Sequence, residues 1–169
     1  MDERHDKLIQ TALTRMEYVA DKPLEEYKHA ITVQLSIMTG STLSYFATMN
    51  SAENVLTMIG WSKSAMGNCS MIDKPIVYKI EETGLWGDAV RERKPVITND
   101  YKNLVKPTKK GYPEGHVNVV RHMNVPIFDG NRIVMVVGVG NKATDYNQED
   151  ARNMIAFMTE VWKVLKMKV

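Results

Sequence analysis

The chain has 169 residues, and this length predicts one domain with its own core. With 22 basic and 20 acidic residues its net charge is +2, which argues against nucleic acid as the main partner. Its single cysteine, Cys69, excludes an intramolecular disulfide framework and a cysteine-rich zinc site, and it predicts a reducing compartment, here the cytoplasm. No apolar run approaches the roughly 20 residues that span a bilayer, so no membrane contact is expected of this segment.

Two helices are predicted at the start of the chain. Residues 3–18 carry apolar side chains at helical spacing, which indicates one amphipathic helix. The sequence Asp21-Lys22-Pro23 breaks this pattern and begins a second helix, because proline is tolerated in a first turn. That helix is expected to run to about Met38, with Gly40 as its C-terminal cap.

The apolar period then changes from that of a helix to that of a strand. Residues 41–49 and 54–61 are predicted to form a hairpin, because only four residues separate them. Residues 62–75 are small, polar and methionine-containing, and they are expected to form a loop or a short helix that holds Cys69. A short strand is predicted over residues 76–80.

A helix, a strand and a long connection are predicted next. The helix covers residues 83–93 and turns its apolar side chains inward, and the strand covers residues 95–98. Residues 101–117 are interrupted by prolines and glycines and form the connection. Loops of this length without secondary structure are usually functional or mobile.

A second hairpin is predicted over residues 119–128 and 132–140, around the turn Asp129-Gly130. Its second strand is apolar at nearly every position, which indicates a central strand covered on both faces. Gly138 and Gly140 indicate a place where another backbone approaches closely.

The last predicted helix covers residues 147–167 and carries a continuous apolar stripe. Its lysine-rich end has no stop signal, as in a helix taken from a longer protein. Hairpins at both ends of the strand region predict an α+β fold, with an antiparallel sheet and the terminal helices on one face. A doubly wound parallel sheet is disfavoured, because no strand–helix–strand unit repeats.

Five short motifs follow one another at a characteristic spacing. They are Gly84–Arg91, Pro95–Tyr101, Pro113–Val117, Val125–Gly130, and Val137–Lys142 followed by Tyr146 and Asp150. In this order they resemble the GAF domains of bacterial and archaeal sensor histidine kinases. The resemblance covers about residues 23–167.

The resemblance implies a five- or six-stranded antiparallel sheet, with N- and C-terminal helices on one face and a small-molecule pocket on the other. It divides the chain into a signalling or dimerisation helix over residues 1–20 and a single GAF domain over residues 21–169. It also implies a sensory role in a two-component system. Such a domain catalyses nothing itself, forms a homodimer through its terminal helices, and relays ligand binding or redox change to a kinase or another output module.

The closing motif of the family consists of Asn-Lys, an aromatic residue and then an acid. Here Lys142 is expected to pair with Asp150 near the start of the last helix, as a structural lock. Tyr146 stands where cyclic-nucleotide-binding members usually have phenylalanine, and Ala151 stands where they have glutamate. The motif therefore does not argue for a cyclic nucleotide.

Three roles are open for Cys69. It can be a small buried thiol that packs as an apolar residue. It can anchor or ligate haem, because thiolate and imidazole both bind iron and some GAF domains of this type hold haem. It can attach a bilin, although Ser70 stands where the usual histidine follows the cysteine. Haem is the leading candidate cofactor, with its iron held by Cys69 or His116. The alternative for His116 is a structural role.

Other candidate cofactor-binding residues lie near the expected pocket. Trp86 and Tyr101 are large aromatic residues that a flat ligand would use, although aromatic residues also belong in cores. Met66 and Met123 are placed near the pocket among 12 methionines, which adapt to irregular shapes. His122 lies on the same strand as Met123, and alternation along a strand turns only one of these two neighbours toward the pocket.

An enzyme is disfavoured, because the sequence has no Gly-rich phosphate loop, paired catalytic carboxylates or metal-spaced cluster. Stand-alone GAF proteins that reduce methionine sulfoxide carry several cysteines, and one cysteine cannot form the intramolecular disulfide. The alternative to a sensor is a cofactor-free dimerisation or structural module, whose pocket is filled by its own methionines.

Overall fold

The computed structural model describes residues 3–62, 76–111 and 117–169. Its strands are β1 (Leu43–Met49), β2 (Val55–Trp61), β3 (Ile76–Lys79), β4 (Val96–Thr98), β5 (His122–Asp129) and β6 (Arg132–Gly140). Its helices are α1 (Glu3–Glu17), α2 (Leu24–Thr39), α4 (Asp88–Arg91) and α5 (Gln148–Leu165), with 3₁₀ turns at Ile80–Glu82 and Leu85–Gly87.

The described strands form one antiparallel sheet of six strands, in the order β3-β2-β1-β6-β5-β4. β6 lies in the middle, between β1 and β5, and every residue from Ile133 to Gly140 is buried. Such burial requires cover on both faces of the strand. The predicted α+β fold and its central apolar strand are therefore confirmed.

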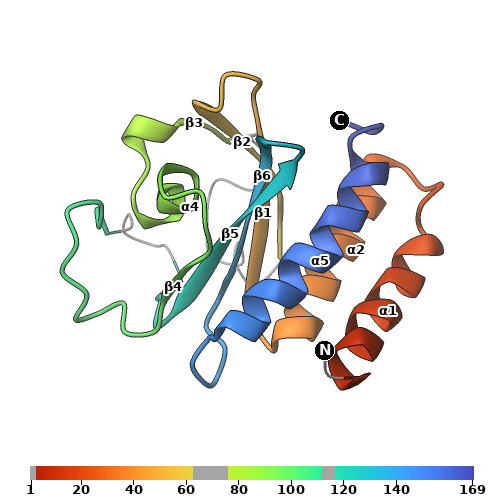
Figure 1. Ribbon diagram of the computed structural model, residues 1–169, viewed down its shortest axis with the longest axis horizontal. Helices are drawn as coiled ribbons and strands as arrows, with labels where there is room; N and C mark the ends of the chain where they lie inside the picture. Colours follow the sequence, from red (N-terminus) through yellow and green to blue (C-terminus); the bar gives the residue numbers. More distant parts are fainter. Residues whose placement is uncertain (1–2, 63–75, 112–116) are drawn as a thin grey trace.

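Helices α1, α2 and α5 lie together on one face of the sheet (Figure 1). α2 and α5 contact the strands, whereas α1 packs on the outside, against α2 and α5. Ala12 and Met16 of α1 are nonetheless buried in the shared core. The largest fully buried side chains of this core include Tyr27, Ile31, Leu35, Phe46, Met123, Met154, Phe157 and Met158.

The two helices that pack on the sheet have well-defined ends. α2 stops at Gly40, whose φ of 68° is left-handed and whose N–H donates to the carbonyl of Ser36. α5 begins with a capping box, in which the Asn147 side chain accepts the N–H of Asp150 and the Asp150 side chain accepts the N–H of Asn147.

The closing motif locks the end of β6 to α5. Lys142 donates to both carboxylate oxygens of Asp150, at 3.0 and 2.8 Å, as predicted. The buried hydroxyl of Tyr146 lies 2.6 Å from Oγ of Ser41 and accepts the N–H of Lys142 at 3.2 Å. Asn99, at the end of β4, bonds both the N–H and the carbonyl of Tyr146. Tyrosine therefore fits this buried position because its hydroxyl has partners.

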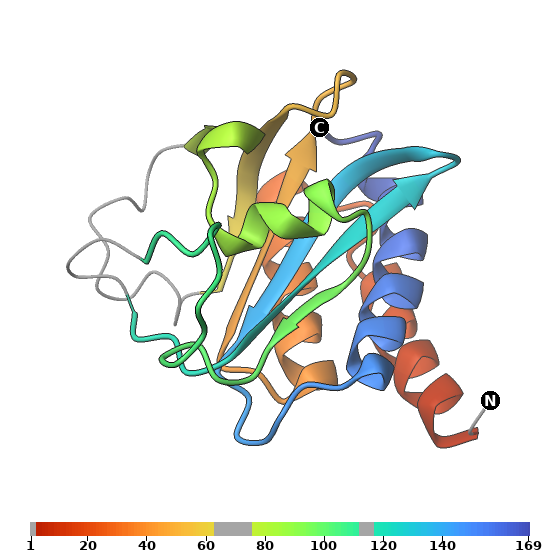
Figure 2. The ribbon, with the colours of Figure 1, turned by 60° about the vertical axis from the view of Figure 1, so that its left-hand side comes forward.

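The opposite face of the sheet, which we call the open face, carries α4 and the connection from β4 to β5 (Figure 2). A second, smaller apolar cluster lies there, formed by residues of β1, β2, β6 and α4. Its buried members are Ala47, Met49, Leu56, Ala89, Val90, Ile133 and Val136.

The helix predicted over residues 83–93 is wrong in extent. Only Asp88–Arg91 is α-helical, and a 3₁₀ turn at Leu85–Gly87 precedes it. The carbonyls of Ile80 and Gly84 close tight turns with the N–H groups of Thr83 and Gly87, three residues on, and the Arg91 guanidinium donates to the same two carbonyls.

The start of β5 was also predicted wrongly. The strand begins at His122 and not at residue 119. The side chain of Asn141 accepts the N–H of Val120 and donates to the carbonyl of Asn118, and these two bonds replace strand pairing there.

Met123 is not a pocket residue, because it faces the helices and is fully buried in the core. None of the helices that the structure describes is long and apolar enough to cross a membrane.

Replacing Tyr146 with phenylalanine is expected to lower the free energy of unfolding by about 1 kcal/mol, because the buried Ser41 hydroxyl loses a partner. Urea unfolding measures this loss. Tyr18→Phe is the control, because Tyr18 is 79% exposed and its hydroxyl remains in water. Equal effects of the two substitutions would contradict the assigned role of Tyr146.

Candidate functional site

Three polar side chains lie side by side across the middle of the open face, and we call them the polar row: Tyr45 on β1, and Asn124 and His122 on β5. The Tyr45 hydroxyl donates to Oδ1 of Asn124, and Nδ2 of Asn124 lies 3.0 Å from Nδ1 of His122. Asn124 is only 1% exposed. The sheet thus presents a hydrogen-bonded polar row on the face opposite the helices.

Gly138 of β6 makes this row possible. It lies between the two outer strands as the cross-strand partner of both Tyr45 and Asn124. A Cβ at Gly138 would lie 2.2 Å from the Tyr45 ring. The sequence predicted a close approach at this glycine, but the approaching group is a side-chain ring and not another backbone.

Aromatic rings flank both ends of the polar row. Trp86 meets Tyr45 edge-on, with ring centroids 6.1 Å apart, and Tyr78 at 5.0 Å. At the other end the Tyr101 ring lies 5.8 Å from the His122 ring. Such edge contacts are favourable for aromatic pairs and hold each ring in one orientation.

Burial determines the charge state of the polar row. It lowers the pKa of His122 to about 4, and the weaker opposing effect of the Asp88 carboxylate does not reverse this. Burial likewise raises the pKa of the Tyr45 hydroxyl. At neutral pH the imidazole is therefore uncharged and the phenol keeps its hydrogen.

A buried carboxylate holds the cover of the open face in place. Asp88 of α4 is 2% exposed, and it accepts from Arg91 at 2.9 and 2.7 Å, Lys106 at 2.7 Å and Thr108 at 2.8 Å. Burial alone would raise the pKa of Asp88, but the hydrogen bonds from Lys106, Thr108 and Arg91 lower it. This cluster ties α4 to the long connection between β4 and β5.

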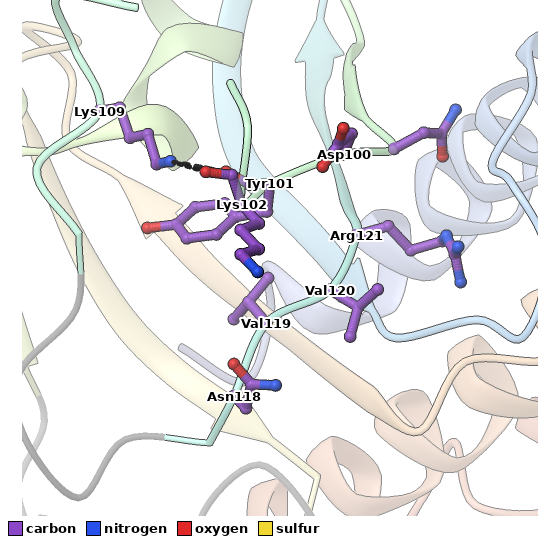
Figure 3. Close-up of a pocket in the computed structure, with 9 residues that line it drawn as sticks. Asp100, Tyr101, Lys102, Lys109, Asn118, Val119, Val120 and Arg121 are labelled. Carbon is purple, nitrogen blue, oxygen red and sulfur yellow. Dashed lines mark hydrogen bonds between the residues drawn. The ribbon is translucent and has the colours of Figure 1, made fainter. Parts of the chain in front are cut away.

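A pocket of about 600 Å³ opens between the start of that connection and the segment that leads into β5 (Figure 3). On the wall that the connection forms, Lys109 donates to the carbonyl of Tyr101 at 2.6 Å and lies over the Tyr101 ring at 4.6 Å. The side chain of Arg121 donates to the carbonyl of Lys142. The full lining is Asn99, Asp100, Tyr101, Lys102, Lys109, Asn118, Val119, Val120 and Arg121, with three cations and one carboxylate.

Of the seven residues predicted near the pocket, the structure brings three to the open face and places Met123 in the core. Trp86 and His122 lie at opposite ends of the polar row, and Tyr101 lies between His122 and the pocket. Cys69, His116 and Met66 lie outside the described residues. Their predicted roles stay predictions. The described residues contain no group of three or more His, Cys, Asp or Glu side chains placed to hold a metal ion.

Sequence reasoning missed Tyr45, Asn124 and Asp88. Gly138 was the available signal for Tyr45, since a glycine in a buried strand makes room for a neighbour. Asn124 stands one alternation step from His122 and would have shared its face. Asp88 gave no signal of its own, because a carboxylate at a helix start is ordinarily an exposed residue.

Asp88→Asn is expected to lower the free energy of unfolding by about 2–4 kcal/mol at neutral pH, because a buried charge cluster loses its anion. The folded state lowers the pKa of Asp88, so this contribution is present above the ordinary value of 3.8 and is lost as the pH falls through the folded-state value. Urea unfolding at neutral and acidic pH should show the difference between wild type and variant shrinking in acid.

Glu92→Gln is the matched control for Asp88→Asn. Glu92 also pairs with Lys106, at 3.2 Å, but its side chain is 38% exposed, so little stability should be lost. A difference between wild type and Asp88→Asn that stays constant from neutral to acidic pH would contradict the ionised role of Asp88.

Gly138→Ala is expected to destabilise the fold by about 1–3 kcal/mol, because the new methyl group overlaps the Tyr45 ring. Gly140→Ala is the control on the same face of β6, where the nearest atom to a new Cβ is a Leu43 methyl at 3.3 Å. Thermal unfolding compares the two variants. A larger loss at Gly140 would be incompatible with the packing described here.

Comparison with known proteins gives both a family and a relative. A family model described as GAF domain matches residues 28–166. The methyl sulfide methyltransferase-associated sensor of Methanosarcina acetivorans is 45% identical over 157 residues, which cover 93% of this chain. The match covers 16% of that relative, so the chain spans about one sixth of its length.

Solved structures agree on the fold. The GAF domain of a phosphoenolpyruvate-protein phosphotransferase from Coxiella burnetii has a TM-score of 0.77 at 13% identity, over 96% of this chain and 93% of that one. A free methionine-R-sulfoxide reductase from Neisseria meningitidis has a TM-score of 0.61 at 14% identity, over 99% and 91%. At such identities the likeness shows the fold alone. The family model and the sensor relative, together with the sheet and its helical layer, show that this chain belongs to the GAF domain family.

Proposed function

We propose that this GAF domain is a sensory input module, which binds a small molecule on its open face and relays the bound state through its terminal helices. The observation that carries this proposal is the two-sidedness of β5. His122 and Asn124 lie on the open face, whereas Met123 and Val125 lie in the core against the helices. α5 packs directly on β5, so a ligand that displaces this strand displaces the surface under α5.

The 45% identical relative is named as a sensor, which supports a sensory role here. We propose a histidine kinase of a two-component system as the output, in the cytoplasm, and we assign no catalytic residue to this domain. The helical layer offers the route to the output, because α1 packs on α5 and α5 packs on the sheet. A homodimer through these helices would carry a shift of α5 from one subunit to the other.

Haem is the leading candidate ligand, with its iron held by Cys69 or His116. Bound there, it would supply a redox-active iron that takes diatomic or sulfur ligands. The described residues fit a flat ring with acidic groups in two respects. The rings of Trp86 and Tyr101 flank the ends of the polar row, and three cations, Lys102, Lys109 and Arg121, outnumber the one carboxylate, Asp100, in the neighbouring pocket. Met66 would complete the apolar surroundings of the ring.

The alternative function is a cofactor-free dimerisation module. Val33 and Ile37, one turn apart on α2, are 36% and 54% exposed, and a second subunit could cover them. In this reading the open face is filled by its own side chains, with methionine as the adaptable filler. Ligand binding separates the two functions.

Haem added to the purified protein is expected to give a Soret band that is lost or shifted in Cys69→Ala or His116→Ala. Absorption spectra of the oxidised and reduced protein measure this. His29→Ala is the control, because His29 is exposed on α2 and distant from the open face in the fold. No Soret change with wild type in either redox state would overturn haem binding. Sedimentation with and without haem then tests the homodimer that both functions predict, and a monomer in both samples would overturn the dimerisation module.

A further inference from the structure

The hydrogen bonds of the polar row run in one direction. The Tyr45 hydroxyl donates to Oδ1 of Asn124, which turns the Nδ2 group of the same amide toward His122. An amide nitrogen donates hydrogen bonds and does not accept them. Nδ1 of His122, 3.0 Å away, is therefore the acceptor.

This direction determines which nitrogen of His122 carries the hydrogen. Burial keeps the imidazole neutral at neutral pH, and a neutral imidazole has one N–H and one lone pair. Because the lone pair at Nδ1 accepts from Asn124, the hydrogen is on Nε2. Within the described part of the chain, no hydrogen bond engages Nε2, and the nearby ring is the edge-on Tyr101.

The pocket beside Tyr101 carries more positive than negative charge, although the charge that acts on the pKa of His122 itself is the Asp88 carboxylate. Tyr101, whose ring lies 5.8 Å from the imidazole, also lines the pocket, whose charged residues are Lys102, Lys109 and Arg121 against the one carboxylate of Asp100. Arg121 in addition lies 3.6 Å from Asp145, so Lys102 and Lys109 supply most of the free positive charge. Lys109 already donates to the carbonyls of Tyr101, Lys102 and Leu104, so it stiffens the pocket wall and adds charge there. A carboxylate that enters beside Tyr101 meets this positive charge and a hydrogen-bond donor.

We propose that His122, as the Nε2–H tautomer set by Tyr45 and Asn124, is the hydrogen-bond donor that selects ligands with a carboxylate at the Tyr101 end of the open face. The proposal rests on the proposed function, namely that a ligand binds this face. It also separates His122 from an iron-ligating role. An iron-bound histidine needs its Nε2 lone pair and donates its other N–H to an acceptor, whereas here Asn124 places a donor opposite Nδ1.

The tautomer is tested without any ligand. Long-range ¹H–¹⁵N spectra of the ¹⁵N-labelled wild-type protein are expected to show His122 with its hydrogen on Nε2, and His122→Gln identifies its signals by their loss. In Tyr45→Phe the Asn124 amide loses the donor that orients it, so the two tautomers should mix. If the spectra of the wild type show the hydrogen on Nδ1, then Asn124 accepts from His122 and donates to Tyr45, and the proposal is overturned.

The carboxylate preference is tested with haem and its dimethyl ester, in which both propionates are blocked. His122→Leu is expected to bind haem roughly tenfold more weakly than wild type, the loss of one hydrogen bond to a charged group, and to bind the ester unchanged. His122→Gln keeps an N–H donor and should retain most of the preference, and His29→Leu is the control. Equal effects of His122→Leu on both porphyrins, or none on either, overturn the carboxylate role.

The failure of haem binding is distinguishable from the failure of this proposal. If wild type binds neither porphyrin, haem is the wrong ligand, and benzoate replaces it as the carboxylate probe. A shift of the His122 Nε2 signal during a benzoate titration, absent in a matched titration with benzamide, supports the proposal. No difference between the two titrations overturns it.

Discussion

Burial of β6 on both faces is the constraint on which the rest of the structure depends. On the helix side its residues lie in the main apolar core, together with residues of α2 and α5. On the open side its neighbours include polar groups that are as deeply buried, and such groups are stable only when they bond one another. Gly138 reconciles the two requirements, because it lets Tyr45 cross the strand and reach Asn124. The polar row is thus a consequence of where the central strand lies.

The two faces of the sheet are held by different forces. The helical layer is attached mainly by apolar burial, which has no preferred direction, and the Lys142–Asp150 ion pair adds a charged contact at the start of α5. The cover of the open face is attached by directed, charged contacts around Asp88 and Lys109. The charged contacts of the open face respond to a ligand's charge and to pH. The apolar contacts of the helical layer respond little to either, so they can transmit a displacement of the sheet. This division suits a domain with its input on one face and its output on the other.

Much of the fold was predictable, because periodicity and turn chemistry act locally. The helical stripes, the turn at Asp129-Gly130, the central strand and the pairing of Lys142 with Asp150 follow from short stretches of sequence. The errors occur where side chains hydrogen-bond the backbone at the end of a predicted element. The carbonyls of Ile80 and Gly84 accept both the N–H three residues on and the Arg91 guanidinium, and the predicted helix shortens. The Asn141 side chain hydrogen-bonds the backbone of residues 118 and 120, and β5 therefore begins at His122 and not at residue 119.

The sequence by itself determined the order of the elements, the antiparallel α+β class, the family resemblance, and Trp86, Tyr101 and His122 as candidates for the open face. It did not decide which side chains of β5 face the helices. Alternation places His122 and Met123 on opposite faces of the sheet, but it does not tell which of the two faces the helices. Only the tertiary structure decided that Met123 is core and that His122 joins Asn124 and Tyr45. The physical reason is that these contacts join residues 79 positions apart through the register of three strands, and register is a property of the whole sheet.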